Sequence, residues 1–292
     1  MMTTDSAPSG HRLQKILAQA GYGSRREIET WISQGQIVIN GKPATLGDRV
    51  RPFDKIKLNG QLIPAERLLY KERRLIIYHK PVGQVTTRND PEGRPTVFDQ
   101  LPRLRGGRWV AVGRLDINTS GLLLFTTDGQ LANTLMHPRH EIEREYAVRV
   151  LGEVTPEMIR RLKEGVMLDD TLAKAQDVKV GGGEGANRWY NIVLKEGRNR
   201  EIRRLWESLG VKVNRLIRVR FDSITLPRDL RAGSHLELTE QQMASLVKLT
   251  PLDERADKPA ANDPPSAAKR GHGRRAVHKN PKQKPRRPAK GR

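Results

Sequence analysis

Short, strand-like apolar runs separated by turns dominate residues 75–252, and they constrain the fold more than any other feature of the chain. Such runs are typical of β-strands, and we expect strands at 75–78, 122–126, 146–150, 189–194 and 215–220. Caps and helical periodicity predict helices at 130–136, 156–163, 201–209 and 240–249. Because these few helices are too irregular for repeated βαβ units, we predict an α+β fold with a mixed, mainly antiparallel sheet.

The first sixty residues follow a different pattern. Leu13, Ile16, Leu17 and Ala20 have helical spacing, and Ser24 with Glu27 forms a capping box that opens a second helix. Strands at 37–39 and 55–58 follow, each ending in an Asn-Gly pair typical of a tight hairpin turn. We therefore predict a small αα-β domain at 11–63, a polar linker at 64–73 and the larger α+β domain at 74–252.

The charge of the chain is strongly positive, with 54 Lys and Arg against 33 Asp and Glu, a net charge of +21. Residues 253–292 hold six Pro and no aromatic residue, so they cannot bury enough apolar surface to offset the entropy of ordering. We predict a disordered basic tail at 253–292, either a solubilising segment or a phosphate contact. A polyanion is the partner that the net charge favours.

Several chemistries lack the residues they need. The chain has no Cys, which excludes disulfides, thiolate metal sites and a Cys nucleophile. It has no nucleotide-binding glycine motif, and His137 and His140 are interpreted as surface or capping side chains, so no cofactor or metal is expected. The longest uncharged apolar run, 121–127, is far shorter than the roughly 20 residues of a membrane-spanning helix. A soluble, unsecreted, cytoplasmic protein without membrane contacts is expected.

Two charged clusters point to chemistry. Arg114 and Asp116 lie in a loop directly before an apolar strand, where charged groups must be solvated, paired or functional. Four arginines lie within seven residues, in a loop and at the start of a predicted helix: Arg198, Arg200, Arg203 and Arg204. Positive charges at a helix N-terminus are unfavourable unless an anion compensates them. We predict that Arg203 pairs with Asp116 and keeps it ionised, as a nucleophile requires, while the neighbouring arginines face phosphate. An ordinary buried Arg–Asp pair would give the same pattern.

Tyr146 is an aromatic residue in one of the predicted strands. Most strand tyrosines pack into a core. The charged residues at positions 143, 144, 145 and 149 argue instead against a wholly buried ring.

Four segments together resemble the motifs of pseudouridine synthases of the RsuA type: HKPVG, GRLDINTSGLLLFTTDG, EREYAV and EGRNREIRRLWESLG. With RNDPEGRPTVFDQLP the resemblance runs nearly unbroken from residue 75 to 250. The segment HRLQKILAQAGYGSRREIETWISQGQIVINGKPA resembles an S4 domain, an RNA-binding module. One departure is Glu201, where many family members carry Gln, and we expect it to affect only the start of the helix.

The resemblance implies isomerisation of a uridine in 23S ribosomal RNA, in the large subunit or its precursor, by a monomer without a cofactor. It implies that Asp116 is the catalytic aspartate, that Tyr146 packs on the target base and that Arg203 is the partner of Asp116. Lys80 and Pro81 would support the floor of the site, and Leu205 would press on the base. Arg114 would fill the stack that the flipped uridine leaves.

The residues expected to bind RNA are Arg114, Lys80, Arg198, Arg200, Arg204, Lys15, Ser24, Arg25, Arg26 and Lys42. Two alternatives stay open. One is a non-catalytic RNA-binding or ribosome-assembly factor that retains an inactive synthase fold. The other is a synthase that acts on a different ribosomal uridine, since target choice depends on surface shape.

Overall fold

The computed structural model describes residues 10–51, 53–68, 73–104, 106–184 and 187–249. The predicted tail at 253–292 lies outside these described residues, as do positions 69–72 of the predicted linker. Within the described ranges no helix is long and apolar enough to cross a membrane.

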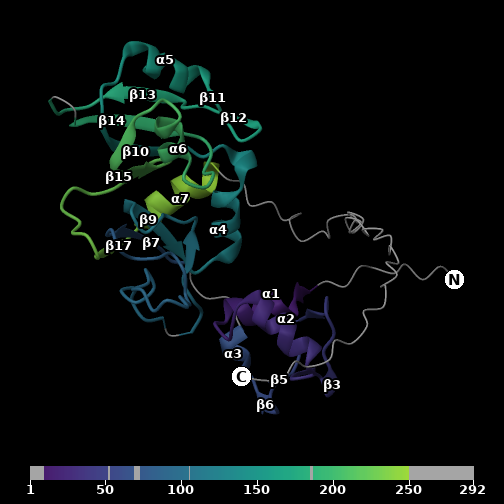
Figure 1. Cartoon of the computed structure of the whole chain (residues 1–292). Helices are drawn as coiled ribbons and strands as arrows, with labels where there is room; N and C mark the ends of the chain where they lie inside the picture. The colour runs from purple at the N-terminus through teal and green to yellow at the C-terminus, as the bar shows by residue number, and fades with distance from the viewer. Residues whose placement is uncertain (1–9, 52, 69–72, 105, 185–186, 250–292) are drawn as a thin grey trace, which may run out of the picture. The chain divides into compact units, whose positions relative to one another are not determined.

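The N-terminal domain contains the two predicted helices and the two predicted hairpins (Figure 1). Ser24 Oγ accepts a hydrogen bond from Glu27 N at 3.1 Å, and the Glu27 carboxylate accepts one from Ser24 N, so the capping box is confirmed. Both Asn-Gly turns have positive φ at both residues, as a type I′ turn requires. The elements are β1 (His11–Arg12), α1 (Leu13–Gln19), α2 (Arg25–Ser33), β2 (Ile37–Ile39), β3 (Lys42–Pro43), β4 (Arg49–Val50), β5 (Ile56–Leu58) and β6 (Gln61–Leu62).

The segment predicted as a linker is partly helical. Helix α3 (Ala65–Leu68) lies in it, and Leu68 packs against the core of the N-terminal domain. That core is formed by α1, α2 and the four-stranded sheet with the order β3-β2-β5-β6. This domain therefore has its own apolar core, although it spans only about fifty residues.

The larger domain is organised around a nine-stranded sheet within the described residues. Its main path runs β13-β14-β10-β15-β9-β7-β17, with β16 paired to β15 and β8 to β9 (Figure 1). Every pairing is antiparallel except the short contact between β15 and β9, so the predicted mixed, mainly antiparallel α+β fold is confirmed. The strands are β7 (Leu75–Lys80), β8 (Val110–Val112), β9 (Ser120–Thr126), β10 (Arg144–Leu151), β13 (Asp177–Val180), β14 (Asn187–Leu194), β15 (Lys212–Phe221), β16 (Ile224–Thr225) and β17 (His235–Glu237).

Helices cover both faces of this sheet. One apolar cluster packs α5 (Pro156–Glu164) and α6 (Glu201–Glu207) against β10 and β14, and a second packs α4 (Gly129–Met136) and α7 (Glu240–Leu249) against β7 and β9. Side chains of β7 and β9 enter both clusters, which explains why the sequences of these two strands are continuous apolar runs. The remaining elements are the 3₁₀ turn η1 (Pro138–His140) and the separate hairpin of β11 (Val166–Leu168) with β12 (Thr171–Ala173).

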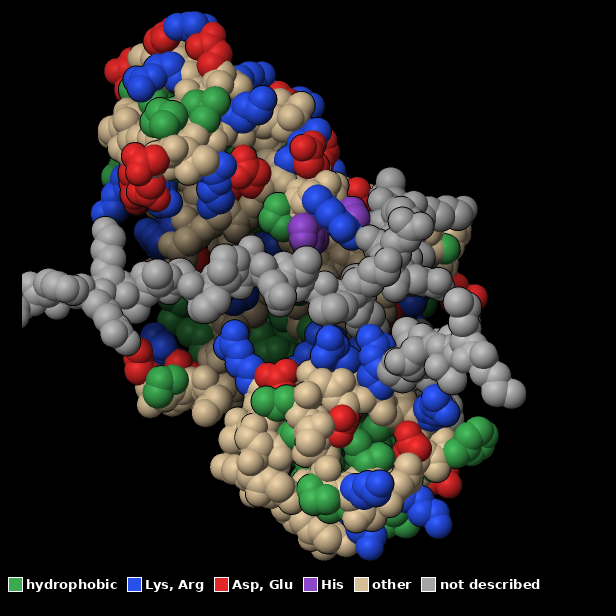
Figure 2. Space-filling view, turned by 90° about the vertical axis from the view of Figure 1, so that its right-hand side faces the viewer, with side chains coloured by type: hydrophobic (Ala, Val, Ile, Leu, Met, Phe, Trp, Pro, Cys, Tyr) green, Lys and Arg blue, Asp and Glu red, His purple; other side chains and the backbone are tan. Residues whose placement is uncertain are grey.

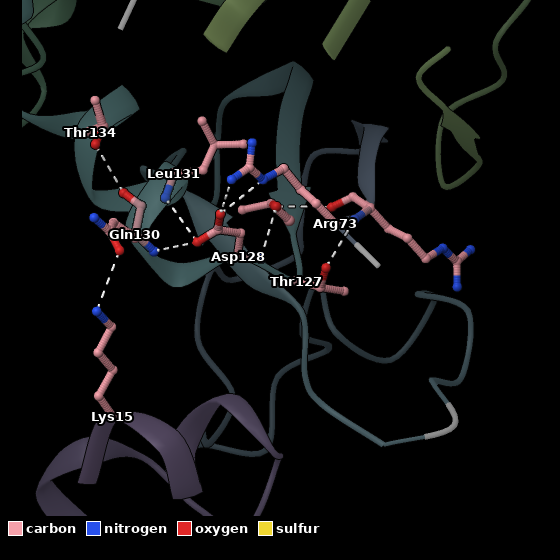
Figure 3. Close-up of polar contacts among 9 residues, drawn as sticks. Lys15, Arg73, Thr127, Asp128, Gln130, Leu131 and Thr134 are labelled. Atoms are coloured by element: carbon pink, nitrogen blue, oxygen red, sulfur yellow. Dashed lines mark hydrogen bonds and ion pairs between the residues drawn. The ribbon is translucent and has the colours of Figure 1, made fainter. Parts of the chain in front are cut away.

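Asp128 connects the entry of the larger domain to helix α4 (Figure 3). Its Oδ1 accepts hydrogen bonds from the backbone N–H groups of Gln130 and Leu131, capping the helix, and its Oδ2 lies 2.9 Å from Arg73 Nη2. Sequence reasoning did not single out this carboxylate. Because it is buried and fully used as a cap and ion-pair partner, its role is structural.

Candidate active site

Asp116 lies in the loop that joins β8 to β9, as predicted. The loop spans residues 113–119 and begins at Gly113, whose φ of 81° lies in the region that favours glycine. Leu115 is buried in the large apolar cluster and fixes the chain on one side of Asp116. Asp116 itself is partly exposed and Arg114 is exposed.

The backbone carbonyls of residues 115 to 119 all accept hydrogen bonds from outside or across the loop. Leu115 O accepts from Thr86 Oγ1 at 2.9 Å and Ile117 O from Gly83 N at 2.9 Å. The remaining donors are Lys80 Nζ to Asp116 O and Thr119 O, Thr119 N to Asp116 O, and Arg203 Nη2 to Asn118 O. The backbone that carries Asp116 is therefore held in one position by donors from three separate segments.

The carboxylate of Asp116 has no hydrogen bond or ion pair with any described residue. Its charge nevertheless acts on two buried cations, since it opposes the lowering of the pKa values of Lys80 and Arg203. A carboxylate beside positive charge, without a donor that blocks its oxygens, is available to attack an electron-poor carbon or to take a proton.

Lys80 does not bind RNA, because its side chain is fully buried. Its ammonium donates to Pro81 O at 3.0 Å, Asp116 O at 3.0 Å and Thr119 O at 2.8 Å. Burial lowers the pKa of Lys80 to about 8. The prediction that Lys80 contacts RNA is wrong for this reason, whereas the implied support of the site floor agrees with these contacts.

We expect Lys80→Met to lower kcat by about 100-fold or more, with little change in RNA affinity, because displacing a catalytic group by about 1 Å costs that much. The unfolding free energy should also respond to pH. The folded protein binds fewer protons than the unfolded chain between about pH 8 and the ordinary lysine pKa, so this group makes stability rise with pH there. Denaturant titrations at several pH values should show that contribution lost in Lys80→Met. The exposed Lys179→Met is the control, and equal kcat values for both variants would contradict the positioning role.

Arg203 lies on α6, close to the loop, but it forms no ion pair with Asp116 within 4.0 Å in the described part of the chain. Its guanidinium instead donates to Asn118 O at 2.8 Å and Val213 O at 3.1 Å. The predicted direct pair is therefore wrong. Arg203 holds the backbone two residues beyond Asp116 and acts on the carboxylate through space.

We expect Arg203→Met to lower both activity and stability. The substitution leaves two carbonyls without their donor, and each buried unsatisfied group costs about 1–3 kcal/mol. Arg188→Met is the matched control, because Arg188 is exposed on β14 and has no predicted role at the site. Urea melts and turnover assays check the pair of variants. Unchanged melts for Arg203→Met would show that the two hydrogen bonds contribute nothing to stability.

Tyr146 lies on β10 and is aligned, across two neighbouring strands, with Gly121 near the start of β9. The strand register pairs Tyr146 with Arg218 of β15, and Arg218 with Gly121 of β9. Two strand spacings, about 10 Å, therefore separate Tyr146 from the start of β9. Tyr146 is only 9 % exposed and belongs to the same buried apolar cluster as Leu115, so the expectation against a buried ring is wrong.

The arginines around α6 differ in their contacts. Arg198 Nε lies 2.6 Å from Glu196 Oε2 and Arg204 Nη2 lies 2.5 Å from Asp169 Oδ2, so two of the groups expected to face phosphate already have carboxylate partners. Arg200 is exposed, with a φ of 49° at the cap of α6. The buried Glu201 accepts a hydrogen bond from Arg198 N at 3.0 Å, and burial raises the pKa of Glu201. This residue therefore also holds the loop before the helix.

Leu205 is fully buried in the large apolar cluster, so in this structure its side chain has no surface on which to pack a base. In the N-terminal domain, Arg25, Arg26 and Lys42 are exposed, Ser24 caps α2, and Lys15 Nζ donates to Gln130 Oε1 at 3.4 Å. RNA binding by these residues stays a prediction. Sequence reasoning missed Thr86, which both donates to Leu115 O and accepts from Leu115 N, and no periodicity or motif in the sequence marks it.

Comparisons with known proteins place both domains. A family model of RNA pseudouridylate synthases matches residues 74–208 and one of S4 domains matches residues 11–56. The chain is 54% identical over 274 residues to ribosomal large subunit pseudouridine synthase B of Escherichia coli strain K12, covering 92% of this chain and 94% of the relative. The protein of the same name from Pseudomonas aeruginosa is 58% identical over 237 residues. That match covers 81% of this chain and 61% of the relative, so the chain aligns with less than two thirds of that longer protein.

A crystal structure of a pseudouridylate synthase has a TM-score of 0.58 and 27% sequence identity to this chain. The match covers 81% of this chain and 100% of the other. The likeness therefore extends over the whole of that enzyme and over most of the residues that the structure describes here.

Proposed function

The chain belongs to the RNA pseudouridylate synthase family, and from this premise we propose that it isomerises one uridine of the large-subunit ribosomal RNA. Relatives that are more than half identical over most of the chain carry the name of a large-subunit enzyme, which supports this substrate. The N-terminal domain supplies the RNA-binding surface. The observation that carries the proposal is that the Asp116 carboxylate has no hydrogen bond or ion pair with a described residue, while the carbonyls of residues 115–119 are all hydrogen-bonded.

The reaction needs one ionised carboxylate. The N1–C1′ bond of uridine breaks, the uracil ring turns within the site and C5 bonds to C1′. C5 then loses its proton, and N1 takes up a proton, either the same one or one from solvent. No electrons are gained or lost overall. Asp116 either attacks the sugar or takes its 2′ proton, and both roles require an oxygen that is not already hydrogen-bonded.

Lys80 and Arg203 keep that oxygen in place. Each donates to carbonyls of the loop and leaves the carboxylate itself unblocked. Pre-organised charge of this kind lowers the barrier without reorganisation during the reaction.

The remaining roles concern the base and the RNA. A base in a duplex must leave its stack to reach Asp116. Arg114, exposed two residues before Asp116, is placed to enter the vacated position, and Tyr146 is the candidate to pack on the base and accept the C5 proton, directly or through water.

The test is to map pseudouridines across ribosomal RNA from cells with and without the gene. We expect one large-subunit position to lose its modification and to regain it when the wild-type gene is restored. Loss at a small-subunit position would overturn the proposed substrate and keep the enzyme class. No loss at any position would favour the non-catalytic RNA-binding or assembly factor.

A further inference from the structure

A cleft lies away from Asp116, where α1 and α3 of the N-terminal domain approach Leu104, residues 106–110 and the start of α4. Its volume is about 760 Å³. Aliphatic side chains contributed by Ile16, Leu68, Leu104 and Val110 form part of its wall. A space of this size is large enough for part of a nucleic-acid chain. None of the predicted catalytic residues lines it.

Hydrogen bonds between backbone and side-chain groups shape this cleft. Gly107 N donates to Ala20 O at 3.1 Å, and Arg108 Nη1 donates to Gly23 O at 2.9 Å. On the other wall, Lys15 on α1 donates to the Gln130 side chain on α4, as Figure 3 shows. The cleft is therefore built by contacts between the two domains within one compact unit, residues 1–252.

The charge of the lining is strongly one-sided. Asp128 is the sole carboxylate among the described lining residues, and it already pairs with Arg73. The lining holds seven Lys and Arg: Lys15, Arg25, Arg51, Arg67, Arg73, Arg74 and Arg108. In the space-filling view, Lys and Arg side chains gather along the side of the N-terminal domain that borders the hollow (Figure 2).

Four of these arginines have no carboxylate within 4.0 Å among the residues that the structure describes: Arg25, Arg51, Arg67 and Arg108. Burial lowers the pKa of Arg108 and the nearby charge of Arg25 lowers it further, while the charge of Glu27 opposes this shift. Positive charges that outnumber the nearby carboxylates are unfavourable, and a bound polyanion reduces that cost. The N-terminal domain and the synthase domain both contribute to this arrangement.

We propose that this cleft holds a segment of the RNA substrate outside the target uridine, with its phosphates on Arg51, Arg67 and Arg108. The inference rests on the proposed function, since it takes the RNA of that reaction as the occupant. Phosphate gives the required negative charge, and the aliphatic wall accepts the faces of sugars or bases. Charge excludes the chain's own residues 253–292 as occupant, because they carry 13 Lys and Arg against 4 Asp and Glu.

The first experiment compares two double variants of equal charge in the full chain. Arg51→Gln with Arg67→Gln removes two charges from the cleft, and Arg188→Gln with Arg215→Gln removes two exposed charges from β14 and β15. We expect the slope of log affinity against log salt to become shallower by about 1.4 for the cleft variant, at about 0.7 per lost phosphate contact on single-stranded RNA. The control slope should not change. Equal slopes for both variants would overturn the proposal.

The second experiment uses the absence of cysteine from the chain. Gln19→Cys introduces one thiol into the lining of the cleft, and Asn214→Cys introduces one on the exposed part of β15. We expect an RNA fragment spanning the target uridine to slow maleimide labelling at position 19 and not at position 214. Equal labelling rates with and without RNA at position 19 would overturn the proposal, and would leave an acidic protein segment as the occupant to examine.

Turnover measured on the same preparations separates the two claims. If the wild-type protein binds RNA but does not isomerise uridine, the proposed function fails, and the slope and labelling data still decide the cleft. If the wild-type protein isomerises uridine and the cleft variant keeps the wild-type slope and KM, the cleft proposal fails alone. We expect the cleft variant to raise KM while kcat at saturating RNA stays within about twofold.

Discussion

Asp116→Asn is expected to abolish pseudouridine formation while RNA affinity stays within a few fold of wild type. The amide has nearly the same shape as the carboxylate but cannot act as an anionic nucleophile or base. The backbone of the loop should not move, because its hydrogen bonds use the carbonyls of residues 115–119 and not the side chain of Asp116. Stability should therefore stay close to that of the wild type.

The measurement is pseudouridine yield per enzyme, with RNA affinity and urea melts on the same preparation. Asp128→Asn is the contrasting variant, because Asp128 caps α4 and pairs with Arg73 without a role at the site. It should lose stability and keep turnover when folded. Substantial turnover by a folded Asp116→Asn protein would refute the catalytic assignment.

Gly121→Ala is expected to prevent stable folding of the larger domain or to cost several kcal/mol. A Cβ at this position would lie 2.3 Å from Arg218 O and 2.6 Å from Arg218 N, both backbone atoms of the neighbouring strand. The φ of 106° is unfavourable for alanine as well. The cause is the close parallel contact of β15 and β9, which joins the two halves of the sheet beside the Asp116 loop.

Gly210→Ala separates the two causes. Gly210 also has a positive φ, 79°, but a Cβ there meets no atom within 4 Å. It should cost only the strain of the backbone conformation, about 1 kcal/mol. Thermal and urea melts of the two variants give the comparison. Equal costs at both positions would show that the close approach of the strands does not matter for stability.

The long strands and the helices of the fold could be predicted because they have a period or a cap. The strand at 144–151 alternates buried and exposed residues, and α5 begins at its Thr155 cap. Other strands, such as β8 and β17, were missed because they are too short to show a period and, unlike β2 and β5, are not followed by an Asn-Gly turn. The order of the strands was also out of reach, since it depends on contacts between residues far apart in the chain.

At the candidate site, the structure brings together the segments that the sequence indicated, but through other contacts than those expected. Arg203 and the Asp116 loop do meet, but through Asn118 O and not through two charged side chains. Lys80 was expected both to support the floor of the site and to bind RNA, on the basis of the family resemblance. In the fold it ends β7, a strand that is covered on both faces, so its ammonium enters the protein and finds three carbonyls.

The sequence by itself determined the family, because family motifs depend on side-chain types at fixed spacing along the chain. It also indicated Asp116, the carboxylate that we propose to be reactive. Only the tertiary structure decided what holds that carboxylate in place and where a second basic cleft forms. The physical reason is that every residue has the same backbone carbonyl. A hydrogen bond to a backbone carbonyl therefore cannot be predicted from the type of the residue that accepts it. A cleft between two domains is lined by segments far apart in the chain, and no local sequence pattern connects them.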